Sequence, residues 1–164
     1  MQPTQKISWR NADTGTLAVL AVLVTSISGQ FATSGNLAPW YAALTKPSFN
    51  PPDWVFGPVW GALYLLMAFA VWRILRLPPS FARRLALILF FLQLALNAAW
   101  SWMFFAAHSP LLGLIDVIPQ LVAVAATAIA FFRIDRIAGW CLVPLVTWVG
   151  YASLLNAAVW SLNR

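Results

Sequence analysis

Five long apolar stretches limit what this chain can fold into more than any other feature of its sequence. A helix needs about 20 mostly apolar residues to cross a bilayer, and the stretches lie at about 17–34, 54–75, 85–105, 111–132 and 137–162. Only 9% of the residues are charged, and the mean hydropathy of +0.79 is too high for a water-soluble domain. The stretches lack β-barrel alternation, so helices must satisfy the backbone hydrogen bonds. The sequence therefore predicts an all-α integral membrane protein, a single bundle of five transmembrane helices.

The first stretch has an alternative interpretation as a cleaved signal peptide, because Lys6 and Arg10 precede it. It is longer than the apolar region of a signal peptide and contains Thr25, Ser28 and Gln30. These features favour a retained helix. Cleavage would leave four spans.

The basic residues are distributed unevenly between the two sides of this bundle. Lys46 and Arg164 lie on one side, and the other eight lie on the opposite side: Lys6, Arg10, Arg73, Arg76, Arg83, Arg84, Arg133 and Arg136. The positive-inside rule then predicts a cytoplasmic N-terminus and an external loop at 35–53. Because the bases flank membrane spans and form no single recognition surface, nucleic-acid binding is not expected.

The sequence contains few residues that are suited to metal binding or to conventional catalysis. His108 and Cys141 are each the only residue of their type, and the chain has four acidic residues. A metal or axial haem site needs several such side chains to converge, so no metal site is predicted. No acid–base pair or activated nucleophile is evident, which argues against ordinary hydrolysis or group transfer. The absence of an internal repeat likewise gives no support to a transporter built from inverted halves.

Four of the predicted helices each carry a stripe of side chains that lipid would not favour. Spacings of mostly three and four residues place the members of each stripe on one helical face. The stripes are Phe56, Trp60, Tyr64 and Met67; Gln93, Asn97, Trp100 and Phe104; Asp116, Gln120, Ala123 and Thr127; and Trp148, Ala152, Leu155 and Asn156. Either they hold the helices together, with small residues such as Gly113 and Gly150 allowing close approach, or they line an internal cavity.

Asp116 is the one carboxylate well inside a predicted span. In hydrocarbon, such a group is expected to be buried against a partner, to be protonated, or to lie near the membrane surface. A structural role and a contact with ligand are equally compatible with the sequence.

The tryptophans fall into two groups by depth. Those near the span ends are explained as an aromatic belt at the membrane interface: Trp9, Trp40, Trp54, Trp72 and Trp140. Trp60, Trp100 and Trp148 lie deeper, on three different helices. Together with Tyr64 and Phe104, they are suited to line an aromatic cavity for a flat apolar ligand.

Four segments in order along the chain carry a family resemblance. They are "WYAALTKPSFNPPDWVFGPVWGALYLLM", "LALNAAWSWMFF", "GLIDVIPQLVA" and "LVPLVTWVGYASLLNAAVW". This series resembles the TspO/MBR family, the tryptophan-rich sensory protein and translocator protein family, also called the peripheral-type benzodiazepine receptor family. The resemblance covers nearly the whole chain, and its proline- and tryptophan-rich first segment is the most specific part.

The resemblance implies a five-helix bundle, usually a homodimer, whose long first loop acts as a lid over a pocket. It implies a receptor that binds porphyrins, such as protoporphyrin IX and haem, and synthetic benzodiazepine-receptor ligands, with no obligatory cofactor. Matching positions place eight residues in the pocket: Tyr41, Pro51, Trp60, Asn97, Trp100, Trp148, Ala152 and Leu155. Trp60 and Trp148 also match tryptophans implicated in light-dependent porphyrin breakdown in some bacterial relatives. The charge asymmetry suits a bacterial inner membrane, and the family leaves the outer membrane open as an alternative.

Two departures from the family pattern bear on function. The C-terminal segment "NAAVWSLNR" lacks the tyrosine of the animal cholesterol-recognition segment, a weak motif in any case, so cholesterol transport is not expected. Leu112 stands where many relatives carry tryptophan, which predicts a reshaped pocket wall.

The first loop also has a physical interpretation as a stiff cover. Pro39, Pro47, Pro51 and Pro52 restrict φ and lack a backbone donor. Pro58 is assigned to about the first turn of the second helix, where a missing N–H costs little. Lys46, the one base of the loop, is suited to meet a porphyrin propionate or a lipid phosphate.

Overall fold

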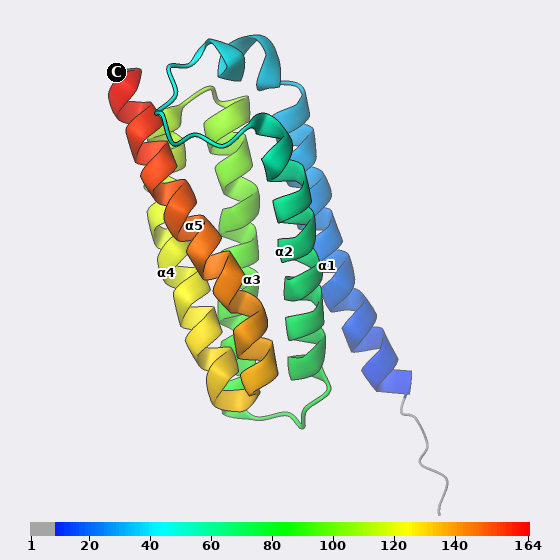
Figure 1. Ribbon diagram of the computed structural model, residues 1–164. Coiled ribbons are helices and arrows are strands. Elements are labelled where there is room, and N and C mark those ends of the chain that lie inside the picture. Colours follow the sequence, from blue (N-terminus) through cyan, green and yellow to red (C-terminus); the bar gives the residue numbers. More distant parts are fainter. Residues whose placement is uncertain (1–8) are drawn as a thin grey trace, which may run out of the picture.

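The computed structural model describes residues 9–164, except for the side chains of residues 9–14 and Ala18. Its long helices are α1 (Trp9–Ser34), α2 (Asp53–Leu75), α3 (Phe81–Ser101), α4 (Pro110–Ile134) and α5 (Arg136–Leu162) (Figure 1). A π-helical turn, η2 (Trp102–Ala106), continues α3. Each predicted apolar stretch falls within one helix, or within α3 and η2 together, and all five are long and apolar enough to span a membrane. The predicted five-helix membrane bundle is confirmed.

The helices surround a shared interior. Their order around the bundle is α1, α2, α5, α4, α3, because each helix packs against the next and α3 packs against α1. Consecutive helices α2 and α3 therefore make little contact with each other. Stripes from all the helices can face one another across this interior.

Polar residues mark where three of the helices begin. The Ser80 hydroxyl accepts a hydrogen bond from the Arg83 amide at 3.1 Å, and the Ser109 hydroxyl accepts one from the Leu112 amide at 3.2 Å. Asp135 accepts from the amides at the start of α5, at 2.9 and 3.1 Å. These N-caps satisfy amides that have no partner within their helices, so short connections suffice between α2 and α3, α3 and α4, and α4 and α5.

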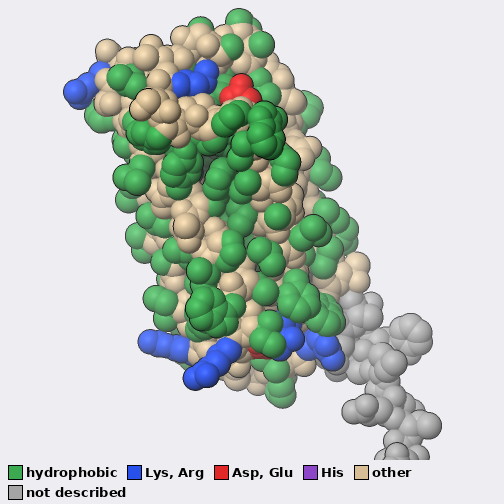
Figure 2. Space-filling model, in the orientation of Figure 1, with side chains coloured by type: hydrophobic (Ala, Val, Ile, Leu, Met, Phe, Trp, Pro, Cys, Tyr) green, Lys and Arg blue, Asp and Glu red, His purple; other side chains and the backbone are tan. Residues whose placement is uncertain are grey.

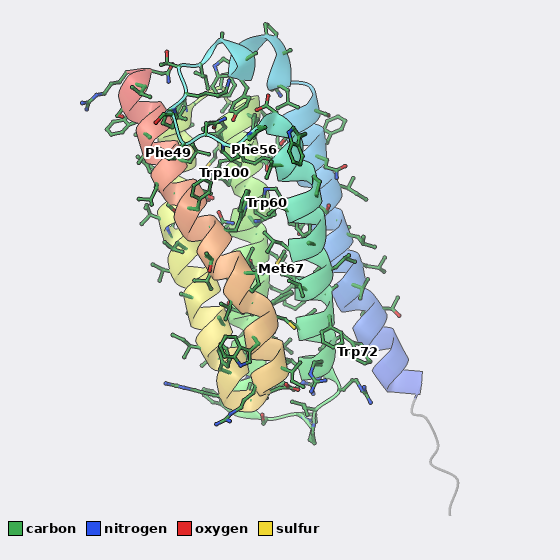
Figure 3. All side chains as sticks on the ribbon, viewed as in Figure 1. Phe49, Phe56, Trp60, Met67, Trp72 and Trp100 are labelled. Atoms are coloured by element: carbon green, nitrogen blue, oxygen red, sulfur yellow. The ribbon has the colours of Figure 1, made fainter. Side chains whose placement is uncertain are left out.

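One half of the bundle interior is a tightly packed apolar core. Met67, Phe90, Val124 and Phe131 are fully buried there, and the Phe90 and Phe131 rings stack with their centroids 5.8 Å apart. Met67 marks the middle of α2 in Figure 3. This core holds the bundle together away from the lid.

Most of the described basic residues lie beyond this core, at the end formed by the α2–α3 and α4–α5 connections (Figure 2). Arg73 Nη2 lies 2.8 Å from Asp135 Oδ2. The hydrogen bond from Arg73 lowers the pKa of Asp135 below its usual range. Lys6 lies outside the described residues, as does the side chain of Arg10, so the charge asymmetry within the structure rests on the other bases.

Pro58 lies deeper in α2 than the sequence analysis predicts. It is the sixth residue of α2, which begins at Asp53, and not a residue of the first turn. At this position its missing N–H leaves the Trp54 carbonyl without the usual helical donor. The prolines before Asp53 set this boundary, since Pro52 has an extended ψ of 142° and immediately precedes the helix.

Candidate functional site

A cavity of about 530 Å³ occupies the lid half of the bundle interior. All five helices contribute to its walls, and Leu37 and Tyr41 of the lid (residues 35–52) cover it. Figure 3 shows Phe56, Trp60 and Trp100 together in this half, well separated from Trp72 at the other end. The volume lies within the range of small-molecule and cofactor sites.

Aromatic rings form the α2, α3 and α5 walls of the cavity. Phe56 and Trp148 meet edge to face, with centroids 5.8 Å apart and an interplanar angle of 73°. The Trp100 ring stacks on Phe104 at 5.0 Å and 16°, and Trp60 lies 5.5 Å from the Tyr64 ring. These pairs hold the rings in preferred geometries, so the aromatic wall is fixed in place.

Two buried asparagines fix this wall through hydrogen bonds between helices. Tyr64 Oη donates to Asn97 Oδ1 at 2.8 Å, and Trp100 Nε1 donates to Asn156 Oδ1 at 3.0 Å. Asn156 Nδ2 in turn donates to the Pro110 carbonyl at 2.7 Å. Thus the two interpretations of the polar stripes both apply, because the same asparagines join helices and line the cavity.

The α1 wall is polar and was not predicted. Ser26, Gln30 and Thr33 line the cavity from α1. The only sequence signal for this polar wall was the presence of these polar residues within an apolar span. Across the interior, Gln120 is 2% exposed and also lines the cavity. No hydrogen bond to its side chain is formed within the part of the chain that the structure describes. Uncharged polar groups therefore face the aromatic walls.

The lid is fastened to α5 at two points. Asn163 accepts from the Thr45 amide and donates to the Thr45 carbonyl, both at 2.9 Å. Tyr151 Oη donates to the Phe49 carbonyl at 2.6 Å. These contacts bridge the last turns of α5 and the middle of the lid, so the lid is closed over the cavity.

Two aromatic residues attach the first part of the lid to η2. Tyr41 is buried against Phe104 and Phe105, with ring centroids 6.3 and 5.4 Å away. Burial, together with the nearby Asp53 carboxylate, raises the pKa of Tyr41 to about 12. Trp40, predicted to be an interface anchor, packs on Phe104 with the ring centroids 5.5 Å apart. The lid thus shares an aromatic cluster with the cavity wall.

Comparison with known protein families identifies one that matches this chain. The sequence model of the TspO/MBR family matches residues 17–161. The chain belongs to the TspO/MBR family.

Members of the TspO/MBR family from distant organisms are similar to this chain over most of its length. The tryptophan-rich protein TspO of Chlorobaculum tepidum is 36% identical, over 90% of this chain and 94% of its own. The translocator protein of Sus scrofa is 37% identical, over 90% of both chains. The tryptophan-rich sensory protein of Cereibacter sphaeroides is 39% identical, over 82% of this chain and 85% of its own. Family membership and the five apolar helices identify a multi-pass integral membrane protein, and they support a general sensory or regulatory role in the membrane.

The structure of this TspO/MBR chain brings most of the predicted pocket residues to one cavity. Those in the lining are Tyr41, Trp60, Asn97, Trp100, Trp148, Ala152 and Leu155. Pro51 is not among them: it lies at the end of the lid, where its carbonyl accepts from Asn50 Nδ2 at 2.8 Å.

Two further residues of this TspO/MBR chain lie outside the cavity lining. Leu112 is 41% exposed and lies outside the cavity lining. The presence of leucine here, where many relatives carry tryptophan, therefore does not reshape the cavity wall. Lys46 is also absent from the lining. Its Nζ donates to the Tyr41 carbonyl at 2.9 Å and lies 4.3 Å from the Tyr41 ring centroid, and these contacts hold the ammonium within the lid.

Asp116 is buried, but it does not line the cavity. It is 4% exposed, and its Oδ2 has no hydrogen-bond partner among the described residues. The burial excludes an exposed position for the carboxylate. Asp116 is also not among the residues that line the cavity. Within residues 9–164, no three His, Cys, Asp or Glu residues gather as a metal site would require.

Proposed function

We propose that this chain binds tetrapyrroles such as protoporphyrin IX and haem within the membrane. In this proposal it senses, sequesters or transports them, and so takes part in regulating tetrapyrrole metabolism. The supporting observation is the aromatic cavity beneath the lid, where Trp60, Trp100 and Trp148 approach from three helices. A flat conjugated ring stacks favourably on such side chains. The neutral polar groups of Ser26, Gln30 and Gln120 offer hydrogen bonds to the pyrrole nitrogens or ring substituents.

Porphyrin absorbance titrations of the purified protein test this proposal. The double variant Trp60→Ala, Trp148→Ala should raise the Kd for protoporphyrin IX about tenfold, because each ring contact contributes about 0.5–1.5 kcal/mol beyond burial. The matched control, Trp72→Ala with Trp140→Ala, removes two indoles outside the cavity lining and should leave the Kd within twofold. Equal affinity in the two double variants would exclude this cavity as the porphyrin site.

Light-dependent porphyrin breakdown is a second candidate function, favoured by the position of Trp60 and Trp148 in the cavity lining. Here the porphyrin absorbs light and is oxidised by molecular oxygen while the two indoles hold it. Illuminated protoporphyrin should then decay faster with the wild-type protein than with the Trp60, Trp148 double variant. Equal decay rates would identify the reaction as unspecific photobleaching.

Measuring the flux of porphyrin across a membrane distinguishes transport from sensing or sequestration. Vesicles loaded with porphyrin and containing the protein should lose porphyrin faster than protein-free vesicles if the chain transports it. Equal rates of porphyrin loss from the two kinds of vesicle would favour a sensor or a buffer.

Two further experiments test the ligands and the assembly expected for this chain. Displacement of bound porphyrin by a synthetic benzodiazepine-receptor ligand tests whether both ligands share the cavity. Cross-linking in the membrane tests the expected homodimer.

A further inference from the structure

A second cavity, of about 560 Å³, lies at the end of the bundle away from the lid, where α2 ends and α3 begins. Its lining residues are Pro79, Ser80, Phe81, Arg83, Arg84 and Leu87. None of these lining residues is acidic, and basic side chains gather at this end in Figure 2. Because α2 and α3 are both long and apolar enough to span a membrane, a cavity at their connection lies at the level of the lipid headgroups.

Arg83 is fixed in this cavity and retains a donor without an acceptor. Its Nη2 donates to the Leu75 carbonyl at 3.0 Å, which holds the guanidinium across the α2–α3 connection. Its Nε is buried and has no hydrogen-bond partner among the described residues. A buried donor is costly to leave unpaired, and guanidinium groups match the geometry of phosphate oxygens. A phosphate in the cavity would supply the acceptor that this Nε lacks.

Arg84 brings a second positive charge to the same cavity. Its guanidinium carbon lies 5.8 Å from the Phe81 ring centroid. Within residues 9–164 as the structure describes them, the one ion pair joins Arg73 to Asp135 and involves neither arginine of the cavity. Both cavity charges are therefore uncompensated by the described side chains, which favours an anionic ligand.

Apolar side chains continue from the cavity along α3. Phe81, Leu85 and Ile88 follow Arg84 around one helical face, since their spacings are three and four residues. They are 73%, 46% and 58% exposed, respectively. A ligand with its phosphate on the arginines would lay an acyl chain on this face, whereas a free phosphate would make no use of it. The arrangement therefore fits a lipid and not a soluble anion.

We propose that this cavity binds the headgroup phosphate of an anionic phospholipid, with the acyl chains lying along α3. Two arginines exceed the single charge of a phosphate diester, so a headgroup without a cation of its own, such as that of phosphatidylglycerol, is preferred. Phosphatidylcholine carries a quaternary amine that the arginines repel. The inference is independent of the proposed function, because the two cavities share no lining residue.

Native mass spectrometry of the purified protein in detergent tests this site. Phosphatidylglycerol and phosphatidylcholine with identical acyl chains are titrated, and the Kd of the first bound lipid is compared. The wild type should bind phosphatidylglycerol at least about tenfold more tightly, because each arginine near the headgroup contributes roughly fivefold. Arg83→Gln with Arg84→Gln should lose most of this preference.

The matched control is Arg133→Gln with Arg136→Gln. It removes the same charge at the α4–α5 connection, outside the cavity lining, and should change the preference by less than twofold. An equal loss in the two double variants would show general attraction to the basic end of the molecule and would overturn the proposal. Equal Kd values for the two lipids in the wild type would overturn it as well.

Two further measurements separate the site from misfolding and from soluble anions. Arg84→Gln alone removes a side chain whose guanidinium contacts the Phe81 ring, and it should weaken phosphatidylglycerol binding about fivefold with an unchanged unfolding midpoint. Unchanged binding in Arg84→Gln would contradict the inference. Inorganic phosphate at millimolar concentration should not displace the lipid, and displacement would identify a soluble anion as the ligand. Porphyrin titrations report on the other cavity and should be unaffected in Arg84→Gln.

Discussion

Gly113 occupies a position where two side chains of the cavity wall leave no room for a Cβ atom. A Cβ built there would lie 2.8 Å from Asn156 Oδ1 and 2.8 Å from Phe104 Cδ2. Asn156 holds the Trp100 indole and Phe104 stacks on it, so this glycine on α4 sets the position of a cavity ring. Gly150 was expected to allow a similar approach, but its nearest neighbour would be a Leu121 methyl at 4.0 Å.

Gly113→Ala is therefore expected to destabilise the protein and weaken porphyrin binding. Overpacking of this kind costs about 1–3 kcal/mol, and the displaced Asn156 would no longer fix Trp100. Thermal unfolding in detergent and porphyrin titration measure the two effects. Gly150→Ala is the matched control, and it should be neutral or slightly stabilising because alanine favours a helix over glycine. Equal unfolding midpoints for the two variants would contradict the prediction.

At the scale of elements, the lid and the end of α5 behave as one unit. Asn163 makes three hydrogen bonds: two to Thr45 in the lid and one from Nδ2 to the Val159 carbonyl at 2.7 Å. Asn163, the residue that follows α5, thereby reaches a segment more than a hundred positions away in sequence. Opening the lid requires these contacts to break while the core around Met67 and Phe90 stays packed.

Asn163→Ala should accelerate release of bound porphyrin at least about fivefold, because two hydrogen bonds to the lid are lost and each contributes about 0.5–1.5 kcal/mol. Stopped-flow dilution of the complex measures the dissociation rate. Ser161→Ala is the control, since the Ser161 hydroxyl donates only to the carbonyl of Ala158 within α5. An unchanged dissociation rate in Asn163→Ala, with the protein folded, would show that this contact does not limit release.

The whole molecule is electrically asymmetric along its long axis. Arginines gather at the α2–α3 and α4–α5 connections, whereas Lys46 and Arg164 are the described bases at the lid end. A band of apolar side chains separates the two ends in Figure 2. The positive-inside rule supports the proposal of an inner-membrane protein with its N-terminus in the cytoplasm and its lid outside.

Cysteine labelling checks this orientation. In a Cys141→Ser background, Ser48→Cys in the lid should react with a membrane-impermeant maleimide in intact cells or spheroplasts. Pro79→Cys in the α2–α3 connection should react only after the membrane is disrupted. Both positions are exposed in the structure, so the difference reports sidedness. The opposite labelling pattern would invert the proposed topology.

The five-helix membrane architecture was predictable from the sequence because the bilayer imposes it locally. Any stretch of about 20 apolar residues must become a helix there to satisfy its own backbone. The same locality made the stripe through Trp60 and the stripe through Trp100 recognisable, since helical periodicity alone places their members on one face. Family motifs then identified seven of the residues that line the cavity.

Tertiary structure decided what the local pattern left open. The ring order α1, α2, α5, α4, α3 determines which stripes meet, and it depends on contacts between residues distant in sequence. Packing thus makes the polar face of α1 part of the cavity lining and leaves Pro51 and Leu112 outside it. It also holds Lys46 within the lid, in contact with Tyr41. The periodicity of a helix shows which side chains share a face, but only packing against other helices determines what that face encloses.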